Sequence, residues 1–269
     1  MSIYLASDIH GPAYRERLAD PSLQDLTKDD YVIVCGDLEM IDLDEDARAA
    51  NIAWLEAQPY TTLFVDGNHE EYAVLEQYPE SEWMGGKDRR ISPSVVFLMR
   101  GQVFQLEGRT FFTMGGAPTF MRARLMGLLE GPDPGMPTDA EIAEAERNLE
   151  RCSWRVDCVL THCVPLSLAE LIFGEGKTFV SPLGEWLDST AAKLDFGHWF
   201  FGHYHCDCQL DADGVAERLG PGHGTFTCVF NLLHRLDDGA TFRDPTPPSS
   251  LRRRHVFVDG PPPSLLPKQ

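Results

Sequence analysis

Residues 2–10 read Ser-Ile-Tyr-Leu-Ala-Ser-Asp-Ile-His, an apolar run that ends abruptly in Asp8 and His10. Short, bounded runs of this kind predict a buried strand. We therefore expect a strand over Ser2–Ala6, with two candidate metal ligands just past its carboxyl end. Asp8 and His10 are two residues apart, so in an extended backbone their side chains lean the same way.

The same arrangement recurs three times along the chain. Apolar runs over Tyr31–Cys35, Thr61–Val65 and Val156–Leu160 lead into Gly36-Asp37, Gly67-Asn68-His69 and Thr161-His162. A further pair, His203 and His205, repeats the two-residue spacing after Gly202. Ligands from separate strands can converge at the carboxyl edge of a sheet with parallel strands. A lone Asp or His is most often structural, so it is the recurrence that indicates a site.

The donors in these positions are carboxylate, amide and imidazole groups. Asp37 offers two oxygens that can bridge two ions, and Asn68 contributes a neutral carbonyl oxygen. Such a mixture suits Mn, Fe, Zn, Ni or Co better than Mg or Ca. The sequence therefore predicts two divalent transition-metal ions, with Mn as the expected one, and no organic cofactor.

Helical patterns separate the apolar runs. They cover Leu43–Ala57 and Asp139–Arg151, and the second is opened by a capping box from Thr138 to Glu141. Pro182 in a first turn predicts a further helix. Strands that alternate with helices, followed by hairpins, predict sheets covered by helices.

The later part of the chain is rich in expected strands. Residues 95–114 predict three short strands separated by Gly101 and Gly108, and residues 199–236 again favour strands. We expect one domain over residues 1–236. The proline-rich residues 237–269 predict an irregular extension that packs on the domain or trails from it.

The composition limits which binding partners and which cellular compartment we expect for this protein. With a formal net charge of −19, the protein should repel polyanions, so we expect no binding to long nucleic acids. No uninterrupted apolar run approaches the roughly 18 residues that a membrane helix requires. The first strand runs directly into Asp8, so we expect no cleaved signal.

The cysteines point to a reducing environment. There are seven, an odd number at irregular spacing, so we expect no disulfide framework and a cytoplasmic location. Cys206-Asp207-Cys208 suggests zinc, but a structural zinc site usually has a second, matching pair, and the sequence shows none. We therefore expect thiols packed along a strand.

Taken together, the ligand-bearing segments resemble the signature of calcineurin-like metallophosphoesterases. The five blocks are Asp8-Ile9-His10, Gly36-Asp37, Gly67-Asn68-His69-Glu70, Thr161-His162 and Gly202-His203-Tyr204-His205. They stand in the order typical of the family. Residues 199–205 and Gly115-Gly116-Ala117 are similar to small bacterial and phage-type members. The resemblance implies an α/β fold, a four-layer αββα sandwich with two mixed β-sheets.

The resemblance also implies roles for individual residues. The first ion would be held by Asp8, His10, Asp37 and His205, and the second by Asp37, Asn68, His162 and His203. A hydroxide bridging the two ions would attack phosphorus in line. His69 would not bind metal but would face the substrate and protonate the leaving oxygen.

The second block departs from the phosphoprotein phosphatase branch, which carries Gly-Asp-x-x-Asp-Arg-Gly. Here the run lacks that Arg, and Met40 replaces the Asp that would orient His69. Arg122 and Arg124 are candidate phosphate-binding residues, with surface arginines as the alternative. We expect a phosphoesterase acting on a small phosphoester or nucleotide. The alternatives are a protein-serine/threonine phosphatase and a non-catalytic binding module on the same fold.

Overall fold

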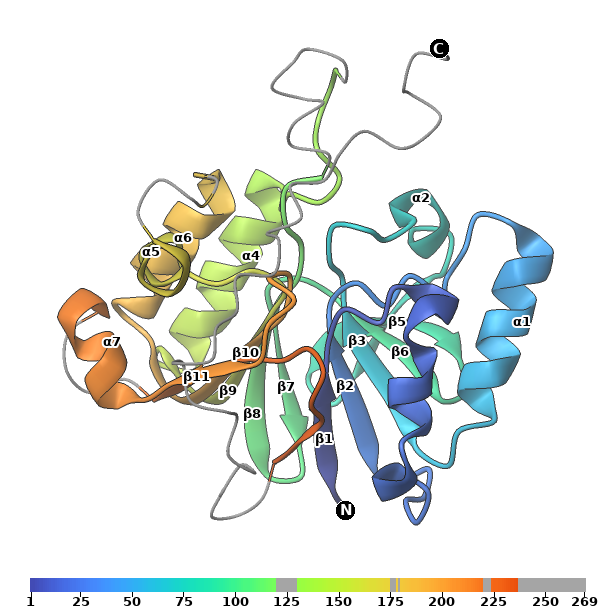
Figure 1. Ribbon diagram of the computed structural model, residues 1–269. Coiled ribbons are helices and arrows are strands. Elements are labelled where there is room, and N and C mark those ends of the chain that lie inside the picture. The colour runs from blue at the N-terminus through green and yellow to red at the C-terminus, as the bar shows by residue number, and fades with distance from the viewer. Residues whose placement is uncertain (120–129, 175–177, 179, 220–223, 237–269) are drawn as a thin grey trace, which may run out of the picture.

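The computed structural model describes residues 1–119, 130–174, 178, 180–219 and 224–236. Two β-sheets pack face to face at the centre, with helices covering their outer faces (Figure 1). Both sheets contain parallel and antiparallel pairs of strands. The expected αββα sandwich with two mixed sheets is therefore confirmed.

The first sheet is built mainly from the amino-terminal part of the chain. Its seven strands are β1 (Ile3–Ala6), β2 (Tyr31–Cys35), β3 (Thr61–Val65), β4 (Glu80–Trp83), β5 (Gly86–Ser92), β6 (Val95–Leu98) and β13 (His234–Leu236). They are ordered β13-β1-β2-β3-β6-β5-β4. Strands β1, β2, β3 and β6 are parallel neighbours, so the carboxyl ends of the first three lie at one edge.

The second sheet is built from the later part of the chain. Its six strands are β7 (Gln102–Leu106), β8 (Arg109–Met114), β9 (Arg155–Thr161), β10 (Asp195–Phe201), β11 (Cys208–Leu210) and β12 (Thr225–Cys228). They are ordered β11-β12-β10-β9-β8-β7, and β8, β9, β10 and β12 run parallel. Strands β6, β7 and β8 confirm the three short strands expected over residues 95–114.

The helices form the outer layers (Figure 1). They are α1 (Glu45–Glu56), α2 (Tyr72–Leu75), α4 (Asp139–Arg151), α5 (Leu166–Phe173), α6 (Pro182–Ala191) and α7 (Ala212–Leu219). Three short 3-10 turns, η1 (Gly11–Ala13), η2 (Arg15–Ala19) and η3 (Pro21–Leu23), follow β1. Helices α1 and α2 lie on the side of the first sheet, and α4 to α7 on the side of the second (Figure 1). No helix among the described residues is long and apolar enough to cross a bilayer.

Alternate residues of the central strands serve two different cores. In β2, Ile33 and Cys35 face the layer between the sheets, whereas Val32 and Val34 face the layer under α1. All four side chains are fully buried. A strand buried on both faces needs apolar residues at every position, which is why it reads as a continuous apolar run.

Local sequence signals predicted the bounds of two helices to within two residues. Helix α4 has the expected bounds, and its capping box is present, with Thr138 and Glu141 each accepting a backbone N–H of the other. Helix α1 begins two residues later than expected because Asp44 caps it, accepting from the backbone N–H of Ala47 at 2.8 Å.

Several elements were not predicted, among them the β4–β5 hairpin, α2, α5, α7 and the 3-10 turns η1 to η3. The hairpin of β4 and β5 lies at the sheet edge, and three of the four β4 residues are exposed, so β4 lacks an apolar pattern. Helix α2 is only four residues long, and α7 interrupts a segment expected to be strand-rich. The extension over 237–269 lies outside the described residues.

Candidate metal centre

The polar residues that follow the central strands of both sheets meet between them. The first sheet supplies Asp8, His10, Asp37, Asn68 and His69 from the ends of β1, β2 and β3. The second supplies His162, His203 and His205 from the ends of β9 and β10. The site therefore depends on how the two sheets are placed against each other.

One group of donors surrounds the facing imidazoles of His10 and His205. Their Nε2 atoms lie 2.9 Å apart, and the Nε2 of His205 lies 3.3 Å from Oδ1 of Asp8. The Nε2 of His10 is 3.9 Å from Oδ2 of Asp37. Two unprotonated ring nitrogens at this separation repel each other unless a proton or a cation lies between them.

A second group shares Asp37 with the first. The Oδ2 of Asp37 lies 3.2 Å from Nε2 of His162. The Oδ1 of Asn68 lies 3.2 Å from the same nitrogen and 2.9 Å from Nδ1 of His203. A divalent ion bound at about 2.0–2.2 Å holds neighbouring donor atoms roughly 3 Å apart, so both groups have the donor set and the spacing that suit such an ion.

His69 lies beside both groups. Its backbone N–H donates to Oδ1 of Asp37 at 3.0 Å, and its ring lies 5.1 Å from that of His10. One ring nitrogen also falls into a compact group with donor atoms of His10 and Asp37. His69 therefore stands where it could contact a substrate held at the centre.

Partners outside the centre orient two of the imidazoles. The Nδ1 of His10 is 3.0 Å from Oε2 of Glu39, and the Nδ1 of His162 is 2.8 Å from the carbonyl oxygen of Cys35. Because carboxylates and carbonyls accept, each Nδ1 carries the hydrogen. The Nε2 lone pair of each ring is thereby left for the centre.

Asp37 and His162 are both fully or almost fully buried, which by itself disfavours their charged forms. Their mutual attraction outweighs burial. It lowers the pKa of Asp37 well below its usual range, with help from His69 and His10, and raises the pKa of His162 to about 10. Metal binding requires the neutral imidazole, so a bound cation would displace the His162 proton.

Most of these residues have a strained backbone. Five of them adopt positive φ angles between 48° and 69°, namely Asp8, His10, Asp37, His203 and His205. This conformation costs non-glycine residues on the order of 1–3 kcal/mol each and persists where the surroundings over-determine it. Backbone hydrogen bonds from Asp8 to Gly36 and from His10 to Asp37 provide such support across β1 and β2.

Sequence reasoning missed several supporting residues. Glu70 is buried and accepts from the backbone N–H groups of Leu38 and Glu39 at 2.9 and 3.1 Å, which holds the turn after Asp37. Its position in the third block, beside His69, is the signal that could have found it.

Two others carry no such signal. Phe230 stacks on His205 with ring centroids 4.7 Å apart, and Arg17 donates to the backbone carbonyls of Phe230 and Asp8. The expected phosphate-binding residues, Arg122 and Arg124, lie outside the described residues.

Comparison with known families identifies the chain. The model of the calcineurin-like phosphoesterase family matches residues 1–207. The chain belongs to this family. Membership confirms the resemblance carried by the five blocks, and it makes metal-dependent phosphoester hydrolysis the class of reaction. The Asp and His groups described above are suited to hold the metal.

Two solved structures are similar to this chain over much of its length. A phosphopantetheinyl hydrolase from Mycobacterium tuberculosis is 16% identical with a TM-score of 0.39, and the match covers 85% of this chain and 89% of that one. A protein of unknown function from Aquifex aeolicus is 15% identical with a TM-score of 0.30, over 61% and 79%. No curated protein matches the sequence.

Proposed function

We propose that this protein hydrolyses a small phosphoester or nucleotide at a centre of two divalent ions. The observation that carries the proposal is the pair of donor groups that share Asp37. One ion would be held by Asp8, His10, Asp37 and His205, and the other by Asp37, Asn68, His162 and His203. Mn is the expected ion, with Fe, Zn, Ni or Co as alternatives.

When bound, the ions would neutralise charge on the phosphoryl oxygens and make a hydroxide nucleophile available near neutral pH. The two carboxylate oxygens of Asp37 have different partners. Oδ1 accepts from the backbone N–H groups of Asn68 and His69 at 2.8 and 3.0 Å, while Oδ2 faces the imidazoles. Asp37 thereby positions His69, which we propose as the proton donor to the leaving oxygen.

Burial indicates the side from which a substrate would arrive. Asp8, Asp37, Asn68 and His162 are buried, whereas His10, His69 and His205 are partly exposed. A phosphoester would therefore meet the centre on the imidazole side. The net charge of −19 favours small substrates over long polyanions.

The second block does not support the protein phosphatase alternative. Met40, which stands where that branch has an Asp, is fully buried in the apolar core under the first sheet. Its thioether is only a weak acceptor and lacks the carboxylate that would orient His69.

Metal analysis of the Mn-reconstituted protein tests the proposal. We expect about two equivalents per chain in the wild type. Asp37→Asn should lose most of both ions, because Asp37 serves both, whereas the exposed control Asp25→Asn should keep them. A wild-type ratio near one, or full metal content in Asp37→Asn, contradicts the two-ion centre.

A panel of phosphomonoesters, phosphodiesters, nucleotides and phosphopeptides then tests the reaction. Turnover of the small esters supports the proposal. Turnover of phosphopeptides alone would favour the protein phosphatase. Full metal content without any turnover would favour the binding module.

A further inference from the structure

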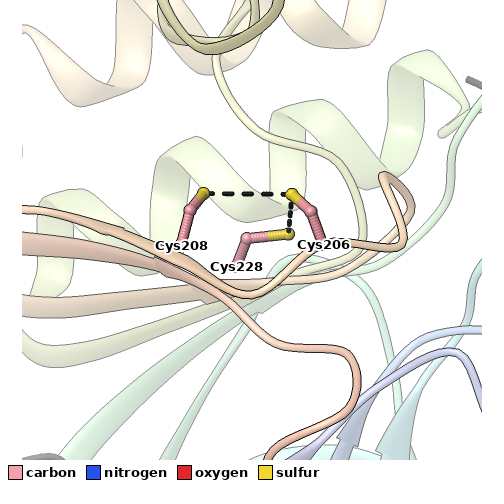
Figure 2. Close-up of side chains that lie close together, drawn as sticks. All are labelled: Cys206, Cys208 and Cys228. Atoms are coloured by element: carbon pink, nitrogen blue, oxygen red, sulfur yellow. Dashed lines mark hydrogen bonds between the residues drawn. The ribbon is translucent and has the colours of Figure 1, made fainter. Parts of the chain in front are cut away.

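Three cysteine side chains meet next to the candidate metal centre. The Sγ of Cys206 lies 3.9 Å from that of Cys208 and 3.7 Å from that of Cys228, and all three sulfurs lie within 4.8 Å of one another (Figure 2). Cys228 is fully buried and the other two are partly exposed. The sequence suggested only the first two, and Cys228 is the thiol that it did not connect with them.

The pairing of two strands brings the third thiol into place. Cys208, at the start of β11, is the direct cross-strand partner of Cys228, at the end of β12. Asp207, between the two cysteines, is directed elsewhere: its carboxylate accepts from the backbone N–H groups of residues 230, 231 and 232. The segment therefore presents two sulfurs to Cys228 and a carboxylate to the loop that follows it.

The spacing of the sulfurs matches that of thiolates around one small ion. A tetrahedral ion with metal–sulfur bonds of about 2.3 Å separates its ligand sulfurs by about 3.8 Å. The two separations from the Sγ of Cys206, 3.7 and 3.9 Å, bracket this value. A disulfide would bring two of the sulfurs to about 2.05 Å.

We propose that Cys206, Cys208 and Cys228 bind one thiophilic d¹⁰ cation, Zn²⁺ or Cu⁺, as three thiolates. Soft sulfur ligands select such ions. On binding, each thiol gives its proton to solvent. Among the described residues, no other Cys, His, Asp or Glu joins this group. Three-coordinate Cu⁺ would be complete, and Zn²⁺ would take a solvent molecule through the exposed side of Cys206 and Cys208.

The donor set separates this site from the phosphoesterase centre. Carboxylate, amide and imidazole groups make up the phosphoesterase centre, and sulfur alone makes up the thiol site. Of the four remaining cysteines, Cys35, Cys158 and Cys163 are buried, and Cys152 donates to the carbonyl of Leu149 at 3.1 Å. None of these four belongs to a described group of potential metal ligands.

An ion here would serve a structural purpose. Strand β11 is three residues long and, among the described strands, pairs with β12 alone, at the edge of the second sheet. The segment before it carries His203 and His205, and the loop after β12 carries Phe230, which stacks on His205. Joining Cys206 and Cys208 to Cys228 would tie these two segments together and hold His205 in place.

Cobalt(II) titration of the reduced, metal-free full chain tests the proposal. Sulfur-to-cobalt charge transfer gives a near-ultraviolet absorption that oxygen and nitrogen ligands do not produce, so it reports on the thiol site alone. We expect this band in the wild type and in Asp37→Asn, which keeps all three thiols. Zn²⁺ or Cu⁺ should abolish it by competition, and X-ray absorption of the bound form should show metal–sulfur distances near about 2.3 Å for Zn²⁺.

Cysteine variants locate the site. Cys208→Ser and Cys228→Ser should each weaken binding of the competing Zn²⁺ or Cu⁺ by at least about 100-fold. Removal of a residue that only hydrogen-bonds to a metal ligand costs about 10–100-fold in metal affinity, and removal of a ligand itself should cost more. The control Cys152→Ser should leave the band and the activity unchanged. Because Cys228 is buried and its variant could fail to fold, the partly exposed Cys208 provides the second variant.

The absence of a charge-transfer band in folded, reduced wild type would overturn the proposal. So would a band that persists in both cluster variants, or recovery of a disulfide among these cysteines as the form present under reducing conditions. Loss of activity in Asp37→Asn bears only on the phosphoesterase centre, so the two proposals fail independently.

Discussion

Substitution of Gly67 by alanine tests how closely the ends of β2 and β3 must approach. A Cβ at this position would lie 2.7 Å from Cγ of Asp37, and closer still to its Oδ1 and backbone nitrogen. Ordinary contact begins at 3.4 Å, so Cγ must retreat by at least 0.7 Å, the difference between these values. Because the backbone nitrogen is also too close, rotation of the Asp37 side chain alone cannot relieve the clash.

The retreat separates Oδ1 of Asp37 from the backbone N–H groups of Asn68 and His69, now 2.8 and 3.0 Å away. Hydrogen bonds to a charged group contribute roughly 1.5–3 kcal/mol each, so we expect the free energy of unfolding to fall by about 3–6 kcal/mol. A displacement approaching 1 Å at a catalytic group costs on the order of 10²-fold in rate. We therefore expect kcat/KM to fall about 100-fold, together with weaker metal binding.

Urea unfolding, metal analysis and p-nitrophenyl phosphate kinetics measure these effects. The matched control is Gly214→Ala in α7, where the nearest atom to an added Cβ is Oδ1 of Asp211 at 3.3 Å. Neither glycine has a positive φ, so the comparison isolates the clash. Alanine in a helix should stabilise the control by roughly 0.5–1 kcal/mol. Wild-type stability and metal content in Gly67→Ala would refute the close approach described here.

Three further predictions concern the reaction, the core and the surface. His69→Ala should keep its metals but lose about 10²–10⁴-fold on alkyl phosphates and much less on p-nitrophenyl phosphate, which has a good leaving group; equal losses in kinetic assays would remove His69 as the acid. Arg100→Met should lower the free energy of unfolding in urea by about 3–5 kcal/mol, because it removes the partner of buried Asp66, whose Oδ2 now accepts from Nε of Arg100 at 2.9 Å. The control Arg155→Met removes a mainly exposed ion pair with Asp195 and should cost under about 1 kcal/mol. Equal costs in the two variants would contradict the role of burial. Gel-shift titration at low salt should show no micromolar binding to DNA or RNA, given the net charge of −19, and tight binding would overturn the charge argument.

The sequence was most informative where local physics decides the structure. The capping box of Thr138 and Glu141 fixes the start of α4, and the continuous apolar run of Tyr31–Cys35 matches β2 residue for residue. It was least informative for Glu80–Trp83, whose exposed polar residues carry no strand pattern. That strand forms because it pairs with Gly86–Ser92, and pairing partners are chosen by the fold and not by the segment itself.

The sequence by itself determined the family and the candidate ligands, because each block combines a strand end with a polar residue at a recognisable spacing. Only the tertiary structure decided that Asp37 and His162, 125 positions apart by their numbers, lie within 3.2 Å, since they come from different sheets. It also decided that Cys228 joins Cys206 and Cys208, through the register of β11 on β12. In both cases, the contact arises from how strands and sheets are placed, and that placement results from burial summed over whole cores, which no short pattern encodes.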